Sequence, residues 1–313
     1  MTCSLCHSDK VIIREKHTRN DLLKTWEWVG NTIEEEVKLE EINIYQCKNC
    51  SLQFFDPLLA GGNKFYSELG KFDWYYGHSG KTEYDYVQKH IRDGDKILDI
   101  GSGSGVLFTK ITKKVDYTGL ELSSKAVELA KEAGINVLQE NFLKYAALHK
   151  SSFDLVCLFQ VLEHLTDLDN FIKSIHLALK PKGLFVIAVP DNDGFISEMP
   201  NNNFNLPPHH VIHWTETSLC YLAKKYEFEV IEVERELLQD IHKEGAYLSY
   251  IGGWLRKFRF RPTLLIDHSK NYGYIAWKAR HLYSKGWFRS IILPFVKKRQ
   301  KYGQSIIITL QKK

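Results

Sequence analysis

A short apolar run over residues 96–100 is followed by three glycines at alternate positions: Gly101, Gly103 and Gly105. Glycine is needed where the backbone adopts positive φ or must lie against a ligand. Residues 106–114 then have the composition of a helix. A strand, a glycine turn and a helix N-terminus together form a binding corner of nucleotide size. The spacing differs from the Gly-x-Gly-x-x-Gly pattern with which dinucleotide sites cradle a pyrophosphate.

Two carboxylates accompany this glycine turn. Asp99 stands two residues before the first glycine, and Glu121 ends the next apolar run, residues 117–121. The 22 positions between the two acids are the span of one strand–helix–strand unit. A carboxylate after the second strand of such a unit can accept two hydrogen bonds from a ribose diol. The acids and the glycines therefore predict a site for a cofactor that contains a nucleoside.

Four of the six cysteines form two Cys-x-x-Cys pairs, 40 residues apart: Cys3, Cys6, Cys47 and Cys50. Two such pairs can supply four thiolates in a tetrahedron, which suits Zn²⁺. Residues 26–29 and 42–45, between the pairs, alternate like strands, which is the layout of a zinc ribbon. A closed set of four thiolates has no open position, so the expected role of the ion is structural. The alternatives are reduced, metal-free cysteines or a redox pair.

The elements that must position these residues follow from the hydrophobic pattern. A chain of 313 residues that is 44% hydrophobic can form one full domain and a smaller one. The expected strands are residues 96–101, 117–121, 135–139, 153–159, 184–190, 228–234 and 304–311. The expected helices between them include residues 125–133, capped by Ser123 or Ser124, and residues 167–179 and 216–226. Because the strands are apolar throughout, they predict a parallel sheet with helices on both faces, an α/β fold.

These landmarks resemble those of the class I S-adenosylmethionine (SAM) dependent methyltransferases, which share the glycine loop and the acid after the second strand. The resemblance covers residues 91–235, and residues 304–313 by topology. It implies a seven-stranded, Rossmann-like sheet whose last two strands are normally joined by a short hairpin. The cysteine pairs also resemble the zinc-bearing extension of some sugar and polysaccharide-biosynthesis methyltransferases. The resemblance therefore implies a methyl-transferring enzyme, a transferase, with SAM as its cofactor and a structural Zn²⁺.

The resemblance also implies which residues bind SAM. The cofactor would lie across residues 101–105 and bind Glu121 with its ribose. Asn141 would meet the adenine amino group and Phe142 would pack on the ring, with a turn residue as the alternative interpretation of Asn141. The full expected set is Asp99, Gly101, Ser102, Gly103, Gly105, Glu121, Leu122, Asn141, Phe142 and Gln160.

Histidines near the ends of the fourth and fifth strands can move a proton from a hydroxyl acceptor. His164 belongs to a Glu-His pair that, in the resembled family, sits near the departing sulfonium. The segment Pro-Pro-His-His-Val-Ile-His-Trp contains His209 and His210, which we favour over His213 as the base. Histidine titrates in the useful range for such a step. The alternative is that these side chains only fix an irregular loop through hydrogen bonds, and that Glu163 is structural.

Aromatic residues and glycines alternate between residues 61 and 90. The aromatic side chains include Phe65, Tyr66, Phe72, Trp74, Tyr75, Tyr76 and His78. This composition indicates a loop or lid rather than a core helix. The segment either covers the bound cofactor or acceptor, or packs between the two domains. Residues 82–91 are expected to be helical.

About 70 residues separate the sixth and seventh expected strands, far more than a hairpin needs. This insertion, residues 236–303, contains most of a basic stretch. Residues 251–303 have 13 Lys and Arg and one acid, a net charge of +12, whereas the chain as a whole has +4. Arg256, Arg259 and Arg261 alternate with aromatic residues there. The segment predicts an anionic acceptor or an anionic membrane surface rather than nucleic acid, with a solvated basic face as the simplest alternative.

The sequence thus predicts three parts. Residues 1–60 form a ribbon-like zinc domain, residues 61–90 an aromatic lid or linker with a helix, and residues 91–313 the methyltransferase domain with its insertion. The expected reaction is methyl transfer to a hydroxyl of a sugar, a glycan or a related anionic acceptor, as in polysaccharide biosynthesis. The competing functions are an RNA methyltransferase and a non-catalytic protein that binds partners. Without a signal-peptide pattern or a long apolar run, we expect a cytoplasmic protein, peripheral to the membrane if the insertion binds lipid.

Overall fold

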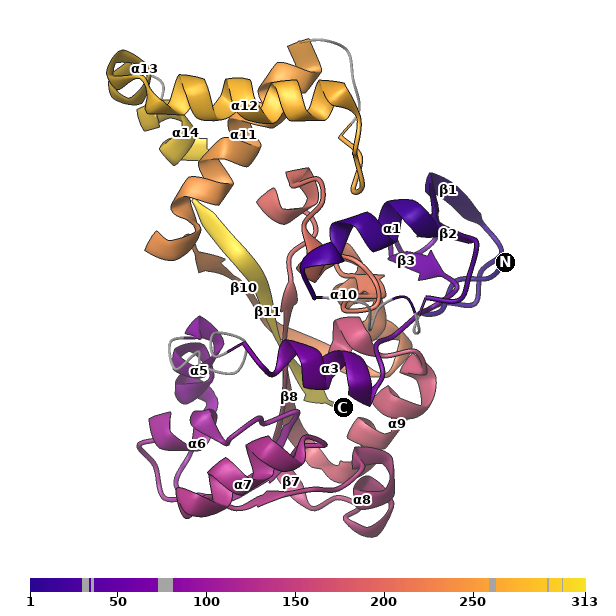
Figure 1. Ribbon diagram of the computed structural model, residues 1–313. Coiled ribbons are helices and arrows are strands. Elements are labelled where there is room, and N and C mark those ends of the chain that lie inside the picture. The colour runs from indigo at the N-terminus through magenta and orange to yellow at the C-terminus, as the bar shows by residue number, and fades with distance from the viewer. Residues whose placement is uncertain (30–33, 35–36, 73–80, 259–262, 292, 300) are drawn as a thin grey trace.

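A seven-stranded sheet forms the centre of the computed structural model, which describes residues 1–29, 34, 37–72, 81–258, 263–291, 293–299 and 301–313 (Figure 1). Its strands are β4 (Lys96–Ile100), β5 (Asp116–Leu120), β6 (Val137–Leu138), β7 (Phe153–Phe159), β8 (Leu179–Pro190), β10 (Phe228–Leu237) and β11 (Tyr302–Lys312). The strand order is β10-β11-β8-β7-β4-β5-β6. Among these strands only β11 runs in the direction opposite to the others, and it pairs antiparallel with both β10 and β8. The expected seven-stranded Rossmann-like sheet is therefore confirmed.

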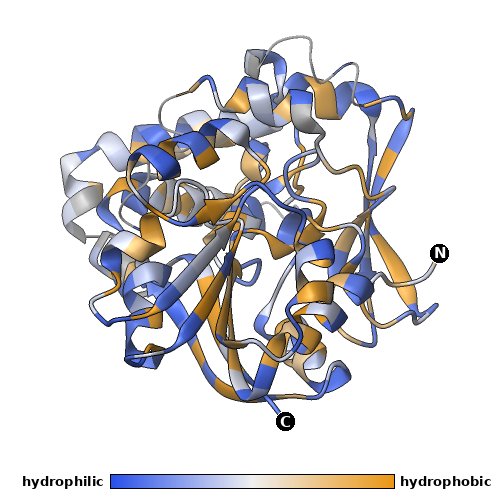
Figure 2. Cartoon of the chain, turned by 90° about the horizontal axis from the view of Figure 1, so that it is seen from below, coloured by the Kyte–Doolittle hydropathy of each residue, from blue (hydrophilic) through white to orange (hydrophobic). Residues whose placement is uncertain are grey.

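Helices cover both faces of this sheet. They are α5 (Thr82–Val87), α6 (Val106–Lys110), α7 (Ser124–Glu132), α8 (Phe142–Leu148), α9 (Leu168–Ala178) and α10 (Glu216–Lys225). One core packs α8, α9 and α10 against side chains such as Val156 and Ile187. The other packs α5, α6 and α7 against their chain neighbours Leu155 and Val186. Successive residues of a strand thus enter opposite cores, as the pleat requires, and Figure 2 shows orange, hydrophobic stretches along these strands.

Some element boundaries differ from those that the sequence predicts. Ser123 caps α7, as expected, but the third strand is shortened to Val137–Leu138 and α6 ends at Lys110. The fifth strand begins at Leu179, because that residue pairs with Phe153 immediately after α9 ends. The strand therefore begins five residues before its expected start at residue 184.

The N-terminal residues form a second, antiparallel sheet of four strands in the order β1-β2-β3-β9. Its strands are β1 (Val11–Thr18), β2 (Glu41–Cys47), β3 (Gln53–Asp56) and β9 (Ile212–His213). The last of these comes from the loop after β8, so the two parts of the chain share a sheet. The expectation of a strand over residues 26–29 was wrong. Trp26 follows helix α1 (Arg19–Thr25) and precedes a 3-10 turn over Glu27–Val29, since Thr18 and Asp21 form a capping box that starts a helix there.

Residues 61–90 include more helix than the composition indicates. Helix α3 (Asn63–Leu69) stands where a loop was expected. Phe65 is fully buried in a core that also contains Trp26 and Leu265, so this aromatic residue packs between the N-terminal sheet and the insertion. The helix predicted over residues 82–91 is present as α5 and a 3-10 turn over Gln88–His90. Trp74, Tyr75, Tyr76 and His78, which were assigned to the lid, lie outside the described residues.

The insertion between β10 and β11 is helical. It contains a 3-10 turn (Asp240–His242) and the helices α11 (Lys243–Phe258), α12 (Lys270–Ser284), α13 (Gly286–Ile291) and α14 (Leu293–Arg299). These helices stand beyond the ends of β10 and β11, at the top of Figure 1. Within the described ranges, no helix combines the length and the apolar character needed to cross a lipid bilayer.

Candidate functional site

The glycine turn after β4 has the backbone that its sequence predicts. Gly101, Gly103 and Gly105 have φ of +72°, +55° and +77°. A side chain at Gly101 is excluded, because a Cβ there would lie 2.4 Å from Cγ2 of Val161. At Gly103, in contrast, a Cβ would meet no described atom within 4 Å. The turn is therefore tight against the loop after β7 on one side and open on the other.

Glu121, at the end of β5, lies beside this turn. Its Oε2 accepts a hydrogen bond of 3.0 Å from the backbone N–H of Gly103. Its Oε1 accepts hydrogen bonds of 2.7 and 2.8 Å from the N–H groups of Leu122 and Ser123. Oε2 therefore has a further lone pair, whereas both lone pairs of Oε1 are used. Glu121 is thus oriented by the backbone and can still accept a hydrogen bond from a ligand through Oε2.

Asp99 and Ser102 point into the protein rather than toward an opening. Asp99 is 3% exposed and accepts a hydrogen bond of 2.8 Å from the hydroxyl of Tyr117. Burial raises the pKa of Asp99 to about 6. The Ser102 side chain is also buried, and a Cβ at Gly119 would lie 2.5 Å from its Oγ. These two buried residues therefore pack on the inner side of the glycine turn and support its conformation.

The residues expected at the adenine lie in different environments. The Asn141 side chain caps α8 by accepting from the N–H groups of Leu143 and Lys144, which is the turn role that the sequence left open. Phe142 is buried and packs on Phe171, with ring centroids 4.8 Å apart. Leu122 is 66% exposed, which is unusual for a leucine beside a binding turn. Of these residues, Leu122 therefore offers the most apolar surface to a ligand.

Gln160, directly after β7, links the turn to residues that the sequence did not single out. It has a φ of +57°, a strained conformation for a residue other than glycine. Its amide donates to Oγ of Ser305 at 3.1 Å and to Oε1 of Glu83 at 3.4 Å. Glu83 belongs to α5 and is 3% exposed, and burial raises the pKa of its carboxyl group. No local pattern marks Glu83, because its partner Gln160 lies 77 residues further along the chain.

The favoured histidines are brought together by the loops after β7 and β8. His164 ends a 3-10 turn (Leu162–His164), and its ring lies 4.8 Å from that of His209 and 4.9 Å from that of His210. The Tyr66 hydroxyl of α3 lies 3.1 Å from Nδ1 of His164. His213 is apart from this group, and its Nε2 donates to the carbonyl of Asn205 at 2.8 Å. The structure therefore separates His213, which fixes a loop, from the other three.

The protonation of this histidine cluster differs from the expectation. Burial lowers the pKa of His164 to about 4, and it lowers the pKa of His209 and of His210 well below the usual value. Burial also raises the pKa of Glu163 to about 8. The expectation that these histidines titrate near neutral pH was therefore wrong, because their buried cationic forms lose hydration. At neutral pH the imidazoles are uncharged and keep a lone pair.

The N-terminal part of the chain holds the loop that carries His209 and His210. The indole N–H of Trp26 donates to the carbonyl of Pro207 at 2.8 Å, and the N–H of Gly61 donates to that of Pro208 at 2.7 Å. Strand β3 then pairs with β9 just beyond the histidines. The N-terminal sheet is therefore part of the framework of the site.

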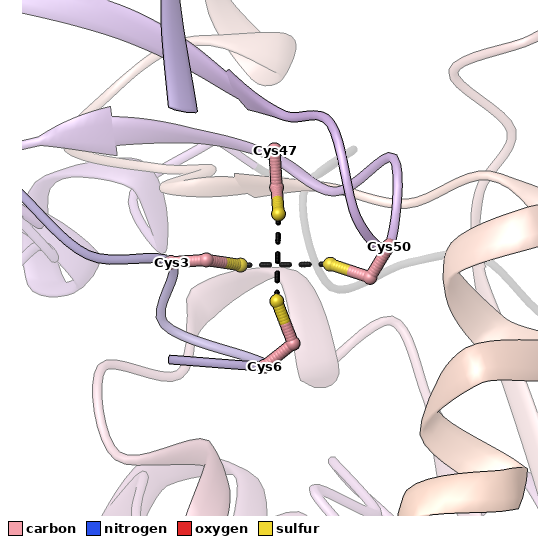
Figure 3. Close-up of side chains that lie close together, drawn as sticks. All are labelled: Cys3, Cys6, Cys47 and Cys50. Atoms are coloured by element: carbon pink, nitrogen blue, oxygen red, sulfur yellow. Dashed lines mark hydrogen bonds between the residues drawn. The ribbon is translucent and has the colours of Figure 1, made fainter. Parts of the chain in front are cut away.

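The four N-terminal cysteines converge on one point, as Figure 3 shows. The Sγ atoms of Cys3 and Cys50 lie 3.5 Å apart, and those of Cys6 and Cys47 lie 3.4 Å apart. All four sulfur atoms lie within 4.8 Å of one another. Four thiolates at this spacing suit tetrahedral zinc.

A pocket of about 390 Å³ lies between the ends of β8, β10 and β11 and helix α11. Its walls include Asp191, Asp193 and Glu198, together with the aromatic rings of Trp254 and Tyr302. Arg235 also lines it and donates from Nε to Asp191 at 2.8 Å. The pocket thus combines carboxylates and aromatic rings at the sheet edge that carries the glycine turn.

Comparison with known proteins agrees with this geometry. Residues 81–233 match the family model described as a methyltransferase domain. The solved structure of a SAM dependent methyltransferase from Archaeoglobus fulgidus aligns with a TM-score of 0.51 at 16% identity, over 79% of this chain and all of that chain. This likeness concerns the fold.

Two curated relatives share the printed name ubiquinone biosynthesis O-methyltransferase. The protein from Histophilus somni is 25% identical over 191 residues, which are 51% of this chain and 80% of the relative. The protein from Klebsiella pneumoniae is 30% identical over 108 residues, which are 32% of this chain and 45% of the relative. The second match thus spans less than half of that relative.

The family match, the strand order and the glycine turn together define the class of protein. Residues 81–233 match a methyltransferase domain, and their sheet shares the fold of the solved SAM dependent methyltransferase. Two features of this chain suit SAM: the open space at Gly103 and the oriented carboxylate of Glu121.

Proposed function

We propose that this chain transfers the methyl group of SAM to a hydroxyl oxygen of a sugar or glycan. The observation that carries the proposal is the pocket between the strand ends and α11, which lies at the same sheet edge as the glycine turn. Aromatic rings offer an apolar face for a sugar ring, and carboxylates accept hydrogen bonds from its hydroxyls. Trp254 supplies such a ring at 57% exposure, and Asp193 supplies such a carboxylate.

In this proposal, different residues bind the cofactor and accept the proton of the acceptor. SAM supplies an activated methyl group on its sulfonium. Glu121 and the turn at Gly103 orient the nucleoside end of SAM, and Leu122 covers it with an apolar side chain. The reaction is a direct displacement, so the acceptor oxygen must be placed in line and its proton must be accepted. Asp193, a carboxylate in the wall of the same pocket, accepts that proton.

The N-terminal cysteines support a structural role for zinc. A closed set of four sulfur ligands leaves no position for a reacting group. Because the same domain fixes Pro207 and Pro208 through hydrogen bonds, the ion stabilises the loop that carries the site histidines.

The helical insertion supports an acceptor or a surface with negative charge. It exposes Trp254, Trp277 and Trp287, each between 57% and 59%, within the segment of net charge +12. Arg256 is an exception, because it is buried and donates to the Glu198 carbonyl at 3.0 Å. Arg259 and Arg261, which were assigned to the same surface, lie outside the described residues.

The relatives named ubiquinone biosynthesis O-methyltransferase favour a second acceptor class, an oxygen atom of a quinone- or quinol-type precursor of ubiquinone. The two classes separate in one experiment. The full chain is incubated with labelled SAM and extract fractions containing small metabolites, lipids, lipid-linked sugars, polysaccharide, RNA or protein. Label in sugar-bearing fractions supports the proposal, and label in a quinol supports the second class. Label in RNA, or label in no fraction while SAM still binds, overturns both.

A further inference from the structure

Three histidines form a second group of potential metal ligands, far in the chain from the four cysteines, and one glutamate lies beside them. His164, His209 and His210 each place a ring nitrogen within 4.8 Å of the others. They come from two loops that end on the same sheet edge, after β7 and after β8. His209 and His210 are buried, whereas the His164 side chain is 20% exposed. The three histidines are therefore accessible to solvent at His164.

Hydrogen bonds to the backbone assign the tautomers of two of these rings. Nδ1 of His164 lies 2.5 Å from the carbonyl oxygen of His209. Nδ1 of His209 lies 3.2 Å from the carbonyl oxygen of Phe204. A carbonyl oxygen can only accept, so each Nδ1 carries the proton and each Nε2 carries the lone pair. Imidazoles that bind metals are oriented by this kind of bond from the other ring nitrogen.

Glu163 provides an independent observation. Its side chain is 1% exposed, and neither carboxyl oxygen has a hydrogen-bond partner among the described residues. Oε1 lies 3.9 Å from Nε2 of His164 and 3.8 Å from Nε2 of His210. Nδ1 of His210 is also buried without a partner within the described part of the chain. Leaving such groups buried and unsatisfied costs free energy, so a ligand that binds them is favoured.

We infer that Glu163, His164, His209 and His210 bind one divalent transition-metal ion, separate from the ion of the four cysteines. Three imidazole nitrogens and one carboxylate oxygen suit Zn²⁺, and also Co²⁺. The ion would lie close to the cofactor turn, because Val161 of the same loop contacts Gly101. Binding requires the buried carboxyl group to lose its proton, and the ion then compensates its charge.

Metal stoichiometry tests this inference without knowledge of the acceptor. The full chain is stripped with a chelator, reloaded with Zn²⁺, freed of excess metal and measured by elemental analysis. We expect two ions in the wild-type chain and one in His210→Ala, which leaves the four cysteines intact. His213→Ala removes a buried histidine outside the group and is expected to keep two ions. Glu163→Gln preserves the shape of the site and is expected to weaken its Zn²⁺ binding at least tenfold.

Cobalt identifies which site is filled. Co²⁺ bound to thiolates gives a sulfur-to-metal charge-transfer band, whereas nitrogen and oxygen ligands give only ligand-field bands. The wild-type chain loaded with Co²⁺ should show the bands of both sites. His210→Ala should keep the charge-transfer band of the cysteine site and lose the ligand-field bands of the nitrogen and oxygen site. Circular dichroism and calorimetric SAM binding check that each variant is folded. Metal content that is unchanged in folded His210→Ala and Glu163→Gln would overturn the inference.

Discussion

The backbone N–H of Gly103 donates a hydrogen bond of 3.0 Å to Oε2 of Glu121, which joins the turn after β4 to the end of β5. The N–H groups of Leu122 and Ser123 hold the other oxygen of the same carboxylate. Three backbone donors thus fix the carboxylate before any ligand arrives. A fixed acceptor loses little conformational entropy on binding, which favours recognition of a ribose.

Glu121→Ala should weaken SAM binding by about 1–3 kcal/mol, the usual cost of losing hydrogen bonds to a charged group. Isothermal titration calorimetry with the full chain measures this change. Glu128→Ala removes the same charge from an exposed position of α7 and should leave the affinity unchanged. Equal affinities for the Glu121 variant and the wild type would refute the assignment of Glu121 to the ribose.

Gly103→Ala separates the strain of the turn from its contact with the cofactor. Positive φ at this residue should cost about 1–2 kcal/mol of unfolding free energy, because L side chains disfavour that conformation. The added methyl group meets no described protein atom, so it occupies the open side of the turn. We therefore expect a stable protein with at least tenfold weaker SAM binding by calorimetry.

Gly134→Ala is the matched control for this substitution. Gly134 has a φ of +70° and likewise meets no described atom within 4 Å, but it lies after α7 and outside the turn. Its alanine variant should lose a similar free energy of unfolding and bind SAM normally. If both variants bind SAM equally well, the open side of the turn at Gly103 is not the cofactor surface.

The cofactor turn could be predicted from the sequence because its residues lie close together in the chain. A glycine turn, a following helix and an acid one unit later are encoded within about 25 consecutive residues, so Gly103 and Glu121 could be identified from spacing. The four cysteines were found for the same reason, because metal-ligand spacing is also a short-range pattern.

The predictions that were wrong or missing concern residues whose contacts lie far away in the sequence. Trp26 was placed in a strand because its segment alternates, but its indole bonds to Pro207, which no local pattern indicates. Glu83 meets Gln160 only after the sheet has formed. The histidine pKa values were misjudged for the same reason, because burial of His210 depends on the N-terminal sheet that covers its loop.

The buried Asp99 should make stability depend on pH. Its folded pKa of about 6 lies above its usual value of 3.8, so between these values the folded chain holds a proton that the unfolded chain has lost. Stability contributed by protonated Asp99 is therefore lost as pH rises from about 4 to 6. Asp99→Asn keeps an acceptor for the Tyr117 hydroxyl and removes the titration.

Denaturant unfolding of the two proteins across this range isolates the effect, since the other groups cancel in the difference. Relative to the wild type, Asp99→Asn should gain about 2–3 kcal/mol between pH 4 and pH 7, because one pKa unit corresponds to about 1.4 kcal/mol. Tyr117→Phe serves as a second comparison, because it removes the hydrogen bond that opposes the upward shift of the Asp99 pKa. A difference that is constant with pH would show that the carboxyl group is not perturbed.

Cys47→Ser should affect catalysis through the loop of His209 and His210. A structural zinc ion contributes on the order of 10 kcal/mol to a small domain, so residues 1–60 should lose their fold without it. The hydrogen bonds to Pro207 and Pro208 and the pairing of β3 with β9 would then be lost. SAM binding should change little, because the glycine turn and Glu121 belong to the large sheet. The rate of methyl transfer, measured with the extract fraction that the wild-type chain labels, should fall by a much larger factor than the affinity for SAM.

Cys220→Ser supplies the control, because this half-buried thiol lies outside the cluster of four. It should keep the metal content, SAM affinity and transfer rate of the wild type. Full metal content in Cys47→Ser would disprove the four-cysteine site. Loss of metal with an unchanged transfer rate would instead show that the loop holds its conformation without the N-terminal sheet, contrary to the hydrogen bonds that cross between them.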